Sequence, residues 1–256
     1  MTKTPVFSLL VAALLLAGCD VKVDDKGLSL NVGGREASDE WTRTYDLPAG
    51  GRLDIANTNG NIDVTGSDLP GVEVRATRRM RANSEEEARQ LLKGLDMGDV
   101  VSAAGVTIEA RPVAASAGVR RNEVGIQYRV RVPAGLVLAL RTTNGTVKLH
   151  NTSGAITAAT TNGAVEAELT SVSGDVMLAT TNGGVRLDLP TDVQANLDAA
   201  CVNGGISIDD QFKANTLGDN SRCRVSAALN GGGPRVSAAT VNGGIRIRAR
   251  GSRQTD

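Results

Sequence analysis

The sequence predicts an all-β protein, most simply a β-solenoid with one short amphipathic helix. Three observations lead to this prediction. The dipeptide Asn-Gly recurs along the chain, most copies are followed by a strand of alternating apolar residues, and aromatic residues make up only 2% of the 256 residues. Alternation with a period of two is typical of β-strands. A core with so few aromatic rings has to be built from Ala, Val, Leu and Ile, which suits the narrow interior of a solenoid.

The spacing of the repeat fits one solenoid coil per unit. Gly145, Gly163, Gly183 and Gly204 are 18, 20 and 21 residues apart. One Ser-Gly dipeptide lies in each of the first two intervals. Because like corners recur once per unit, they can stack from coil to coil about 4.8 Å apart. An antiparallel β-meander or sandwich is the alternative, since Asn-Gly is also a preferred two-residue hairpin turn.

Stacking would arrange equivalent residues in columns along the solenoid. Two residues before each Asn stand Thr142, Thr160, Thr180, Cys201 and Thr240, and four residues after it stand Lys148, Glu166, Arg186, Ser207 and Arg246. Opposite charges in the second of these columns would be neighbours. The corner column itself is a predicted ladder of Asn144, Asn162, Asn182, Asn203 and Asn242, each followed by its glycine, Gly145, Gly163, Gly183, Gly204 and Gly243.

A further column brings carboxylates together. Six residues after successive Asn residues stand Glu168, Asp188 and Asp209, with His150 before them and Arg248 after them. Carboxylates so close repel one another or recruit a cation, and oxygen ligands favour calcium. The alternative is a solvated acidic stripe without a metal, and we expect neither a metal centre nor a cofactor elsewhere in the chain.

The first half of the chain carries looser versions of the same pattern and one helix. Alternating runs occur at residues 53–55, 62–64, 72–76, 106–108 and 124–132. Residues 84–95 break the pattern, because Ser84 and Glu87 form a capping box and Ala88, Leu91, Leu92 and Leu95 follow helical spacing. We expect this helix to cover an end or face of the stack, where strand edges would otherwise be open, and a partner-binding helix is the alternative.

The N-terminus predicts export. Residues 1–18 contain Lys3 followed by an apolar run from Val6 to Ala17, which is too short to span a bilayer and is typical of a signal peptide. Ala17 and Gly18 before Cys19 resemble the bacterial lipoprotein cleavage box. The resemblance implies cleavage before Cys19, acylation of its thiol and new amine with fatty acids such as palmitate, and membrane attachment through this N-terminal lipid.

These features divide the chain into four parts. Residues 1–18 are the signal peptide, 19–40 the lipidated cysteine and a polar tether, 41–249 the repeat domain and 250–256 a polar tail. Asp20 resembles an inner-membrane retention signal of enteric bacteria, but inner and outer membrane both remain open. We therefore expect an exported protein that is anchored to a bacterial membrane and faces the periplasm.

Once Cys19 is assigned to lipid, two cysteines remain. Cys201 and Cys223 form an even pair in an exported, oxidising compartment, which predicts a disulfide. Two buried free thiols are the alternative. We do not expect a metal site here, because two cysteines and one distant histidine make a poor ligand set.

Charge and motifs exclude several functions. The chain has 28 basic and 28 acidic residues, which argues against a nucleic-acid binder that neutralises phosphates. Loss of Lys3 with the signal peptide leaves 27 basic and 28 acidic residues, a net charge of −1. His150 is the only histidine in the sequence, and no phosphate loop or paired metal-binding histidines occur. We therefore expect no enzymatic activity.

The layout resembles the bacterial "putative adhesin" β-strand-repeat domain of unknown function over roughly residues 41–249. The resemblance is carried by residues 45–51 (YDLPAGG), 57–62 (NTNGNI), 132–135 (VPAG), 231–235 (GGGPR) and 240–245 (TVNGGI). It implies an all-β, solenoid-like domain of envelope proteins, some of them linked to envelope stress, and it implies no catalytic residues.

Three classes of function follow from these observations. The first is a non-enzymatic, lipid-anchored scaffold or adhesin-like binding module for envelope glycan or protein. The second is a regulatory partner of a membrane sensor in envelope stress, which shares every sequence feature with the first. The third is a polysaccharide-acting β-helix enzyme, which the shortage of aromatic sugar platforms disfavours. We expect the first.

Overall fold

A computed structural model describes residues 20–24, 27–31, 35–47, 50–110, 124–217 and 221–250. The signal peptide and Cys19 lie outside the described residues, as do residues 251–256 of the predicted tail. In the predicted tether, strands β1 (Asp20–Asp24) and β2 (Gly27–Asn31) pair as an antiparallel hairpin. No helix of the described residues has both the length and the apolar composition needed to cross a membrane.

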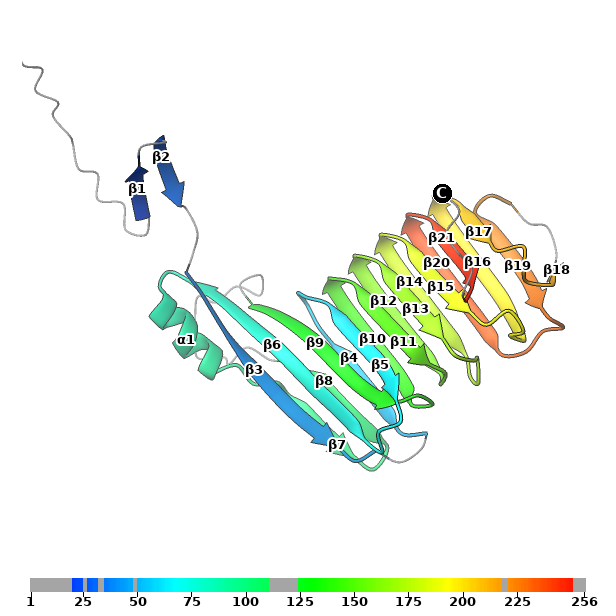
Figure 1. The fold of residues 1–256 in the computed structure, drawn as a ribbon, viewed down its shortest axis with the longest axis horizontal. Helices are drawn as coiled ribbons and strands as arrows, with labels where there is room; N and C mark the ends of the chain where they lie inside the picture. The colour runs from blue at the N-terminus through cyan, green and yellow to red at the C-terminus, as the bar shows by residue number, and fades with distance from the viewer. Residues whose placement is uncertain are drawn as a thin grey trace, which may run out of the picture.

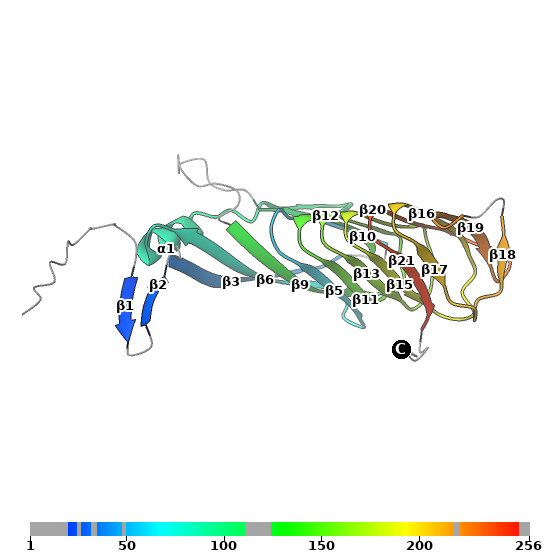
Figure 2. The ribbon, with the colours of Figure 1, turned by 90° about the horizontal axis from the view of Figure 1, so that it is seen from above.

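Among the described residues that follow, two sheets face one another (Figures 1 and 2). Sheet I has the strand order β18-β19-β16-β20-β14-β12-β10-β4-β8-β7, and sheet II has the order β17-β21-β15-β13-β11-β5-β9-β6-β3. Each coil contributes one strand to sheet I and the next strand along the chain to sheet II. The predicted solenoid is therefore confirmed, and the meander is wrong for the stacked coils because their strands pair in parallel.

Four coils follow one another in the first part of the stack. Their strands in sheet I are β4 (Arg52–Ala56), β10 (Val137–Asn144), β12 (Ile156–Asn162) and β14 (Val176–Asn182). Their strands in sheet II are β5 (Ile62–Ser67), β11 (Val147–Thr152), β13 (Val165–Leu169) and β15 (Val185–Leu189).

The core is a continuous column of aliphatic side chains between the two sheets. Leu140, Leu149, Ala158, Val165 and Leu178 are each 0% exposed, and the charged residues between them point outward. Successive side chains of a strand point to opposite faces, so the alternating sequence places Val and Leu inside and the charges outside. The strands of these four coils contain no aromatic residue, which fits a narrow interior.

The last coil of the sequence is not the last coil of the stack. This C-terminal coil consists of β20 (Arg235–Asn242) and β21 (Ile245–Ala249). It lies between the β14/β15 coil and the coil formed by β16 (Ala195–Asn203) and β17 (Ile206–Ile208). The chain thus leaves a gap of one coil after residue 189 and returns later to fill it (Figure 1).

An antiparallel extension closes that end of sheet I. Strand β19 (Arg224–Leu229) pairs with the outer edge of β16, and β18 (Ala214–Thr216) pairs with β19. The predicted disulfide is present and joins Cys201 in β16 to Cys223, immediately before β19. The N–H of Cys201 also donates to the carbonyl of Cys223 at 2.9 Å, so covalent and backbone bonds hold the same pair of strands together.

The opposite end consists of two strands that pair in parallel with the first coil, antiparallel strands beyond them, and the helix. Strand β9 (Val124–Pro133) continues sheet II to β6 (Val72–Ala82) and β3 (Arg35–Tyr45), while β8 (Gly105–Glu109) and β7 (Asp99–Ser102) continue sheet I. The sheet begins at Arg35, so the predicted domain start at residue 41 is late. Residues 35–40 alternate poorly in hydropathy because β3 is an edge strand.

Helix α1 (Glu85–Lys93) packs against β3 and β6, as Figure 2 shows at that end. It begins where the capping box predicted, because the Ser84 hydroxyl accepts a hydrogen bond from the Glu87 N–H at 3.1 Å. Its buried residues are Ala88 and Leu92. Arg78 of β6 lies beneath it, bonded to both oxygens of Asp39 and to the Leu95 carbonyl.

Candidate functional site

The stacked Asn corners form a continuous ladder of side-chain amides. Asn182 Nδ2 donates to Asn162 Oδ1 at 2.9 Å, and Asn162 Nδ2 donates to Asn144 Oδ1 at the same distance. The ladder also includes Asn59, whose Oδ1 accepts from Asn144 and whose Nδ2 donates to the Val124 carbonyl. From one end to the other its order is Asn59, Asn144, Asn162, Asn182, Asn242 and Asn203.

Glycine at the corner is required by the approach of the next coil. At Gly163 the backbone has a φ of +152°, and a Cβ there would lie 2.1 Å from the Gly145 carbonyl oxygen. The glycines also continue the ladder through the backbone, since Gly145 N–H donates to the Asn162 carbonyl at 3.0 Å. Equivalent bonds are made by Gly163, Gly183 and Gly243, and a Cβ on Gly204 would lie 1.8 Å from the Gly243 oxygen.

The threonine column supports the same corners from inside. The hydroxyls of Thr160, Thr180 and Thr240 each donate to a corner glycine carbonyl at 2.8 Å, and all three residues are buried. Thr142 does the same to Gly60 at 3.1 Å. Cys201 occupies the equivalent place in the last coil of the stack, where the disulfide replaces the hydroxyl bond. Amide ladder and threonine column together fix the spacing of the coils.

The prediction that three carboxylates adjoin in one row is wrong. Glu168 and Asp188 are neighbours in register, but the next residue along the row is Arg248 rather than Asp209, because the C-terminal coil is inserted there. Asp209 instead accepts hydrogen bonds from Gln211 N–H and Ala249 N–H. In the described ranges no group of three or more His, Cys, Asp or Glu residues could hold a metal ion.

The remaining members of this row form a charge network. Glu168 accepts from Arg250 Nε at 2.9 Å and lies 3.5 Å from His150 Nδ1. Burial raises the pKa of Asp188, while Arg186 and Arg248 oppose that rise. This arrangement is a paired, partly buried strip of charge rather than an open cation site.

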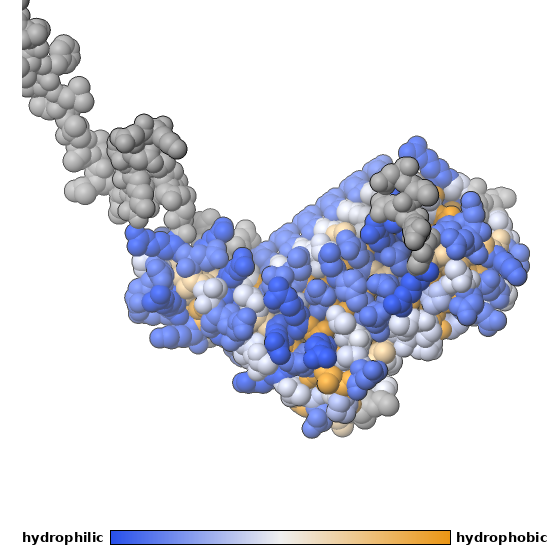
Figure 3. Space-filling model, in the orientation of Figure 1, coloured by the Kyte–Doolittle hydropathy of each residue, from blue (hydrophilic) through white to orange (hydrophobic). Residues whose placement is uncertain are grey.

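Insertion of the C-terminal coil also changes which residues are neighbours in the other charged row, the one formed by the residues four positions after each Asn. Lys148 Nζ and Glu166 Oε2 form an ion pair at 3.3 Å, as opposite charges in the row predict. Arg186, however, lies next to Arg246 and not next to Ser207. Two guanidinium groups therefore stand side by side on the outer face of sheet II, which is the largely hydrophilic face turned to the viewer in Figure 3.

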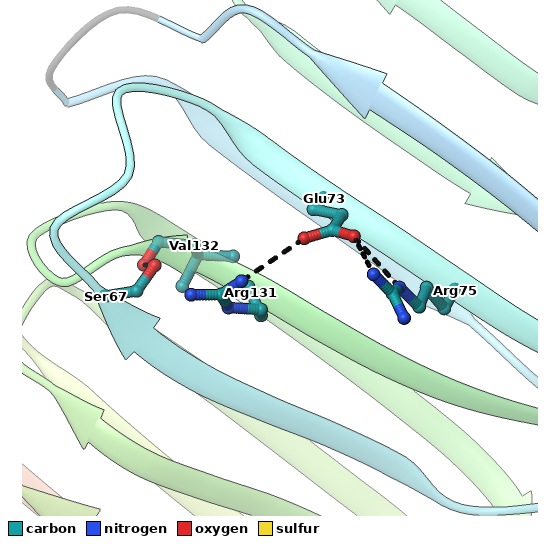
Figure 4. Close-up of polar contacts among 5 residues, drawn as sticks. All are labelled: Ser67, Glu73, Arg75, Arg131 and Val132. Carbon is teal, nitrogen blue, oxygen red and sulfur yellow. Dashed lines mark hydrogen bonds and ion pairs between the residues drawn. The ribbon is translucent and has the colours of Figure 1, made fainter.

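Two grooves open on this outer face. The first, the arginine groove, lies at the end near α1, has a volume of about 320 Å³ and is lined by Asp63, Thr65, Glu73, Arg75, Arg129 and Arg131. Glu73 bridges Arg75 at 2.7 Å and Arg131 at 3.5 Å, as Figure 4 shows. The hydrogen bond from Arg75 lowers the pKa of Glu73. Arg129 stands in register between Arg75 and Asp63, so this groove carries more positive than negative charge.

The second, the glycine groove, lies at the other end of the same face and has a volume of about 390 Å³. Its floor is formed by Ala164, Gly184, Gly244 and Gly205, the residues that follow successive corner glycines. Arg186, Arg246, Glu166 and Ser207 line its side. Both grooves offer guanidinium groups, which suit oxyanions such as carboxylates, sulfates and phosphates.

Sequence reasoning found the charged residues of the glycine groove but not the groove. The repeat spacing predicts Arg186 and Arg246 in one row, and Gly-Gly pairs at 183–184, 204–205 and 243–244 are visible in the sequence. The signal for a recess is the second glycine of each pair, which has no side chain to fill the space beside the row. What the sequence could not show is that Arg246 follows Arg186 directly.

Comparison with known proteins supports the resemblance seen in the sequence. Residues 133–248 match the family described as Toastrack DUF4097. A structure of a "putative cell adhesion protein" from Clostridium sporogenes is similar with a TM-score of 0.57 and 12% identity, over 84% of this chain and 100% of that one. These findings support a β-repeat domain family of unknown function.

A "putative adhesin" from Bacteroides fragilis is also 12% identical, over 82% of this chain and 97% of that one, with a TM-score of 0.28. No curated protein matches the chain in sequence. At 12% identity, the similarity to the Clostridium sporogenes structure shows a shared fold and nothing about function.

Proposed function

We propose that this protein is a non-enzymatic binding or scaffold module of the bacterial cell envelope, anchored by lipid at Cys19 and binding through the outer face of sheet II. The observation that carries the proposal is the way this face is constructed. Amide ladder, threonine column and parallel pairing hold its charged rows at a fixed spacing, so the face is ordered before any ligand arrives. Preorganised groups lose less entropy on binding.

Its position on the molecule supports a binding role. The N-terminal tether and α1 are at one end of the stack, and the two grooves lie along the same face between that end and the other. A protein held by its N-terminus can present such a face to envelope material without any chemical step. The names of similar structures, "putative cell adhesion protein" and "putative adhesin", agree with this role.

The anchor is tested on the full chain expressed in a bacterial host. We expect the protein to fractionate with membranes and its N-terminal peptide to carry fatty acids on Cys19, and we expect Cys19→Ala to abolish both. Membrane fractionation and mass spectrometry of that peptide measure the two outcomes. An unmodified Cys19 in the membrane-bound protein would contradict the proposed anchor.

The binding face is tested by retention on purified envelope material. The lipidated full chain in detergent is compared with two double variants that each lose two positive charges. Arg75→Gln/Arg186→Gln changes the outer face of sheet II, and Arg141→Gln/Arg235→Gln changes exposed arginines of sheet I. We expect only the first variant to lose retention on the envelope polysaccharide fraction. Equal retention of both variants would argue against sheet II as the binding face.

The regulatory alternative makes a different prediction for the same material. A partner of a membrane sensor would bind a membrane protein and would not be retained by protein-free envelope polysaccharide. Retention that requires the protein fraction, and that Arg75→Gln/Arg186→Gln removes, would favour this second function.

A further inference from the structure

We infer that the glycine groove is a binding site for the oxyanions of an acidic polysaccharide. This inference rests on the proposed function and names the class of ligand for one part of the proposed face. It is carried by three features of the groove: arginines that form no ion pair among the described residues, a floor made mostly of glycine, and backbone N–H groups that have no acceptor in the part of the chain that the structure describes.

Arg186 and Arg246 are direct neighbours on adjacent parallel strands, about 4.8 Å apart along the stack. Within the described part of the chain neither forms an ion pair, and Glu166, which is in register with Arg186, is paired with Lys148 at 3.3 Å. Like charges at this spacing repel one another in the unliganded protein. An oxyanion between them would relieve that repulsion and accept hydrogen bonds from both guanidinium groups.

A third arginine stands at the end of the groove. A Cβ added to Gly205 would lie 3.8 Å from Arg222 Nε, so the Arg222 side chain is beside the last glycine of the floor. Arg222 also forms no ion pair among the residues that the structure describes. It lies next to Cys223, and the disulfide to Cys201 holds this part of the chain against the stack. Three positive groups thus surround one recess.

The floor leaves room for a ligand over the backbone. Gly184, Gly244 and Gly205 are in register in successive coils, and their φ angles lie outside the left-handed region. A Cβ on Gly244 would be 3.5 Å from the Gly205 carbonyl oxygen, which is an ordinary contact. Backbone conformation therefore does not require glycine at position 244. The missing side chain is a feature of the groove rather than of the corner.

Asn61 shows what an oxygen atom does at this position. It occupies the same column five coils away from Gly205 in the register, and its Oδ1 accepts a hydrogen bond from Thr146 N–H of the next coil at 2.9 Å. The equivalent N–H groups of Gly184, Gly244 and Gly205 have no acceptor among the described residues. A ligand oxygen in the glycine groove can take the place that Asn61 Oδ1 fills near the other end.

The geometry favours a narrow chain over a flat membrane surface. The glycine floor runs along the stack and is recessed beside the arginine row. Glu166 lines the groove but is paired with Lys148 at 3.3 Å. Glu168 and Asp188 stand on the same face beside the groove, and a plane of anionic lipid headgroups would bring negative charge against them. A polymer with spaced carboxylates or sulfates can follow the recess and avoid these side chains. We therefore assign the site to an acidic polysaccharide.

Two variants test the groove in different ways. Arg186→Gln/Arg246→Gln removes the paired charges. Gly244→Asn keeps the charge and places an amide oxygen where Asn61 has one, so that the protein occupies its own site. We expect both to weaken binding of polygalacturonate, which carries carboxylates, and of dextran sulfate about tenfold or more. The matched control Arg141→Gln/Arg235→Gln should bind as the unmodified protein does.

Binding is measured by calorimetry with the lipidated full chain in detergent, at low and at physiological salt. Neutral dextran should not bind, and the affinity for the acidic polymers should fall as salt rises. A thermal melt of each variant shows whether it is folded. Preference between polygalacturonate and dextran sulfate distinguishes carboxylate from sulfate as the bound group.

Three results would overturn the inference. One is unchanged affinity in the folded Gly244→Asn and Arg186→Gln/Arg246→Gln variants. Another is binding to phosphatidylcholine vesicles that increases with added phosphatidylglycerol, without binding to either polymer. The third is no binding to any acidic polymer by a protein that envelope material still retains through sheet II, which would leave the proposed function intact. Loss of that retention as well would count against the proposed function itself.

Discussion

At the scale of single residues, the amide ladder is both a strong determinant of the fold and an exposed one. Asn162 accepts from Asn182 and donates to Asn144, whereas Asn203, at the end of the ladder, donates only to Asn242. All of these side chains are solvent-accessible, so water can partly replace a lost bond. Each bond is therefore expected to contribute modestly, and the ladder acts through repetition.

The first prediction concerns the middle of this ladder. Replacement Asn162→Ala removes two side-chain hydrogen bonds and should lower the free energy of unfolding by about 1–2 kcal/mol. Asn203→Ala removes one and should cost roughly half as much. Chemical denaturation measures both. Equal losses at the two positions would show that the ladder bonds do not determine the difference.

The second prediction concerns Asp188, whose pKa is raised mainly by burial. A carboxyl with a raised pKa in the folded state contributes stability below its unfolded pKa and loses it as pH rises through the folded value. Asp188→Asn, which cannot ionise, should therefore gain stability relative to the unmodified protein between acidic and neutral pH. Denaturation at pH 3 to 7 measures this difference, with exposed Asp192→Asn as the control. A difference that stays constant with pH would contradict the assignment.

At the scale of elements, the two ends of the stack are protected in different ways. The end near α1 uses long antiparallel strands and a helix that covers the inner side of β3 and β6. The other end uses β19 and β18 on the edge of sheet I, with a disulfide at the start of β19. In sheet II the edge strand β17 has only three residues, and a short edge offers little template for association.

The third prediction follows from this capping. The Cys201–Cys223 bridge has a sequence separation of 22, and loops of this size gain about 3 kcal/mol in the chain-entropy model. Cys201→Ser/Cys223→Ser should lower stability by up to this amount, and addition of reductant should do the same to the unmodified protein. Thermal denaturation with and without reductant measures both effects.

The double variant supplies the control for that experiment, because reductant should leave its melting temperature unchanged. In hydrogen exchange, the loss of protection should be greatest in β19 and β16 and small in β10 to β13. Uniform loss over the whole stack would mean that the bridge does not act locally as a cap.

Much of the element level could be predicted from the sequence because local chemistry determines it. The capping box at Ser84 and Glu87, the corner glycines and the period-two strands each have a short-range cause. The start of the domain was missed because Arg35 to Glu40 belong to an edge strand that carries polar residues on both faces. Hairpin β1–β2 lies in the region expected to be a tether, where weak alternation at Val21, Val23, Leu28 and Leu30 was the only signal.

At the scale of the whole molecule, the order of the coils was beyond the reach of the sequence. Asn242 and Asn203 have the same place in the repeat, and so do Thr240 and Cys201, so either could stack on Asn182 and Thr180. The repeat pattern alone does not distinguish the two orders. The choice depends on the long-range path of residues 209–234, which places β19 on the outer edge of β16 and leaves the gap for the C-terminal coil.

This order also determines which side chains meet on the binding face. Had the coils stacked in chain order, Asp188 would adjoin Asp209 and Arg186 would adjoin Ser207. Insertion of the C-terminal coil separates the two carboxylates and joins the two arginines instead. The candidate site therefore changes from a cation row to an anion groove through the order of the coils.

The last prediction tests whether the inserted coil is needed for the end of the stack. Removal of residues 235–256 deletes the strands that join β14 to β16 and β15 to β17. We expect residues 195–230 to lose protection from hydrogen exchange, whereas the coils from β4/β5 to β12/β13 keep theirs, because contacts between coils are local. A chain that lacks only the tail, residues 251–256, is the control. Retained protection in β16 and β17 would mean that this coil docks directly on β14 and β15, so that the two orders are close in free energy. Loss of the whole stack in the truncated chain would mean that the coils fold as one cooperative unit, in which the insertion closes the structure.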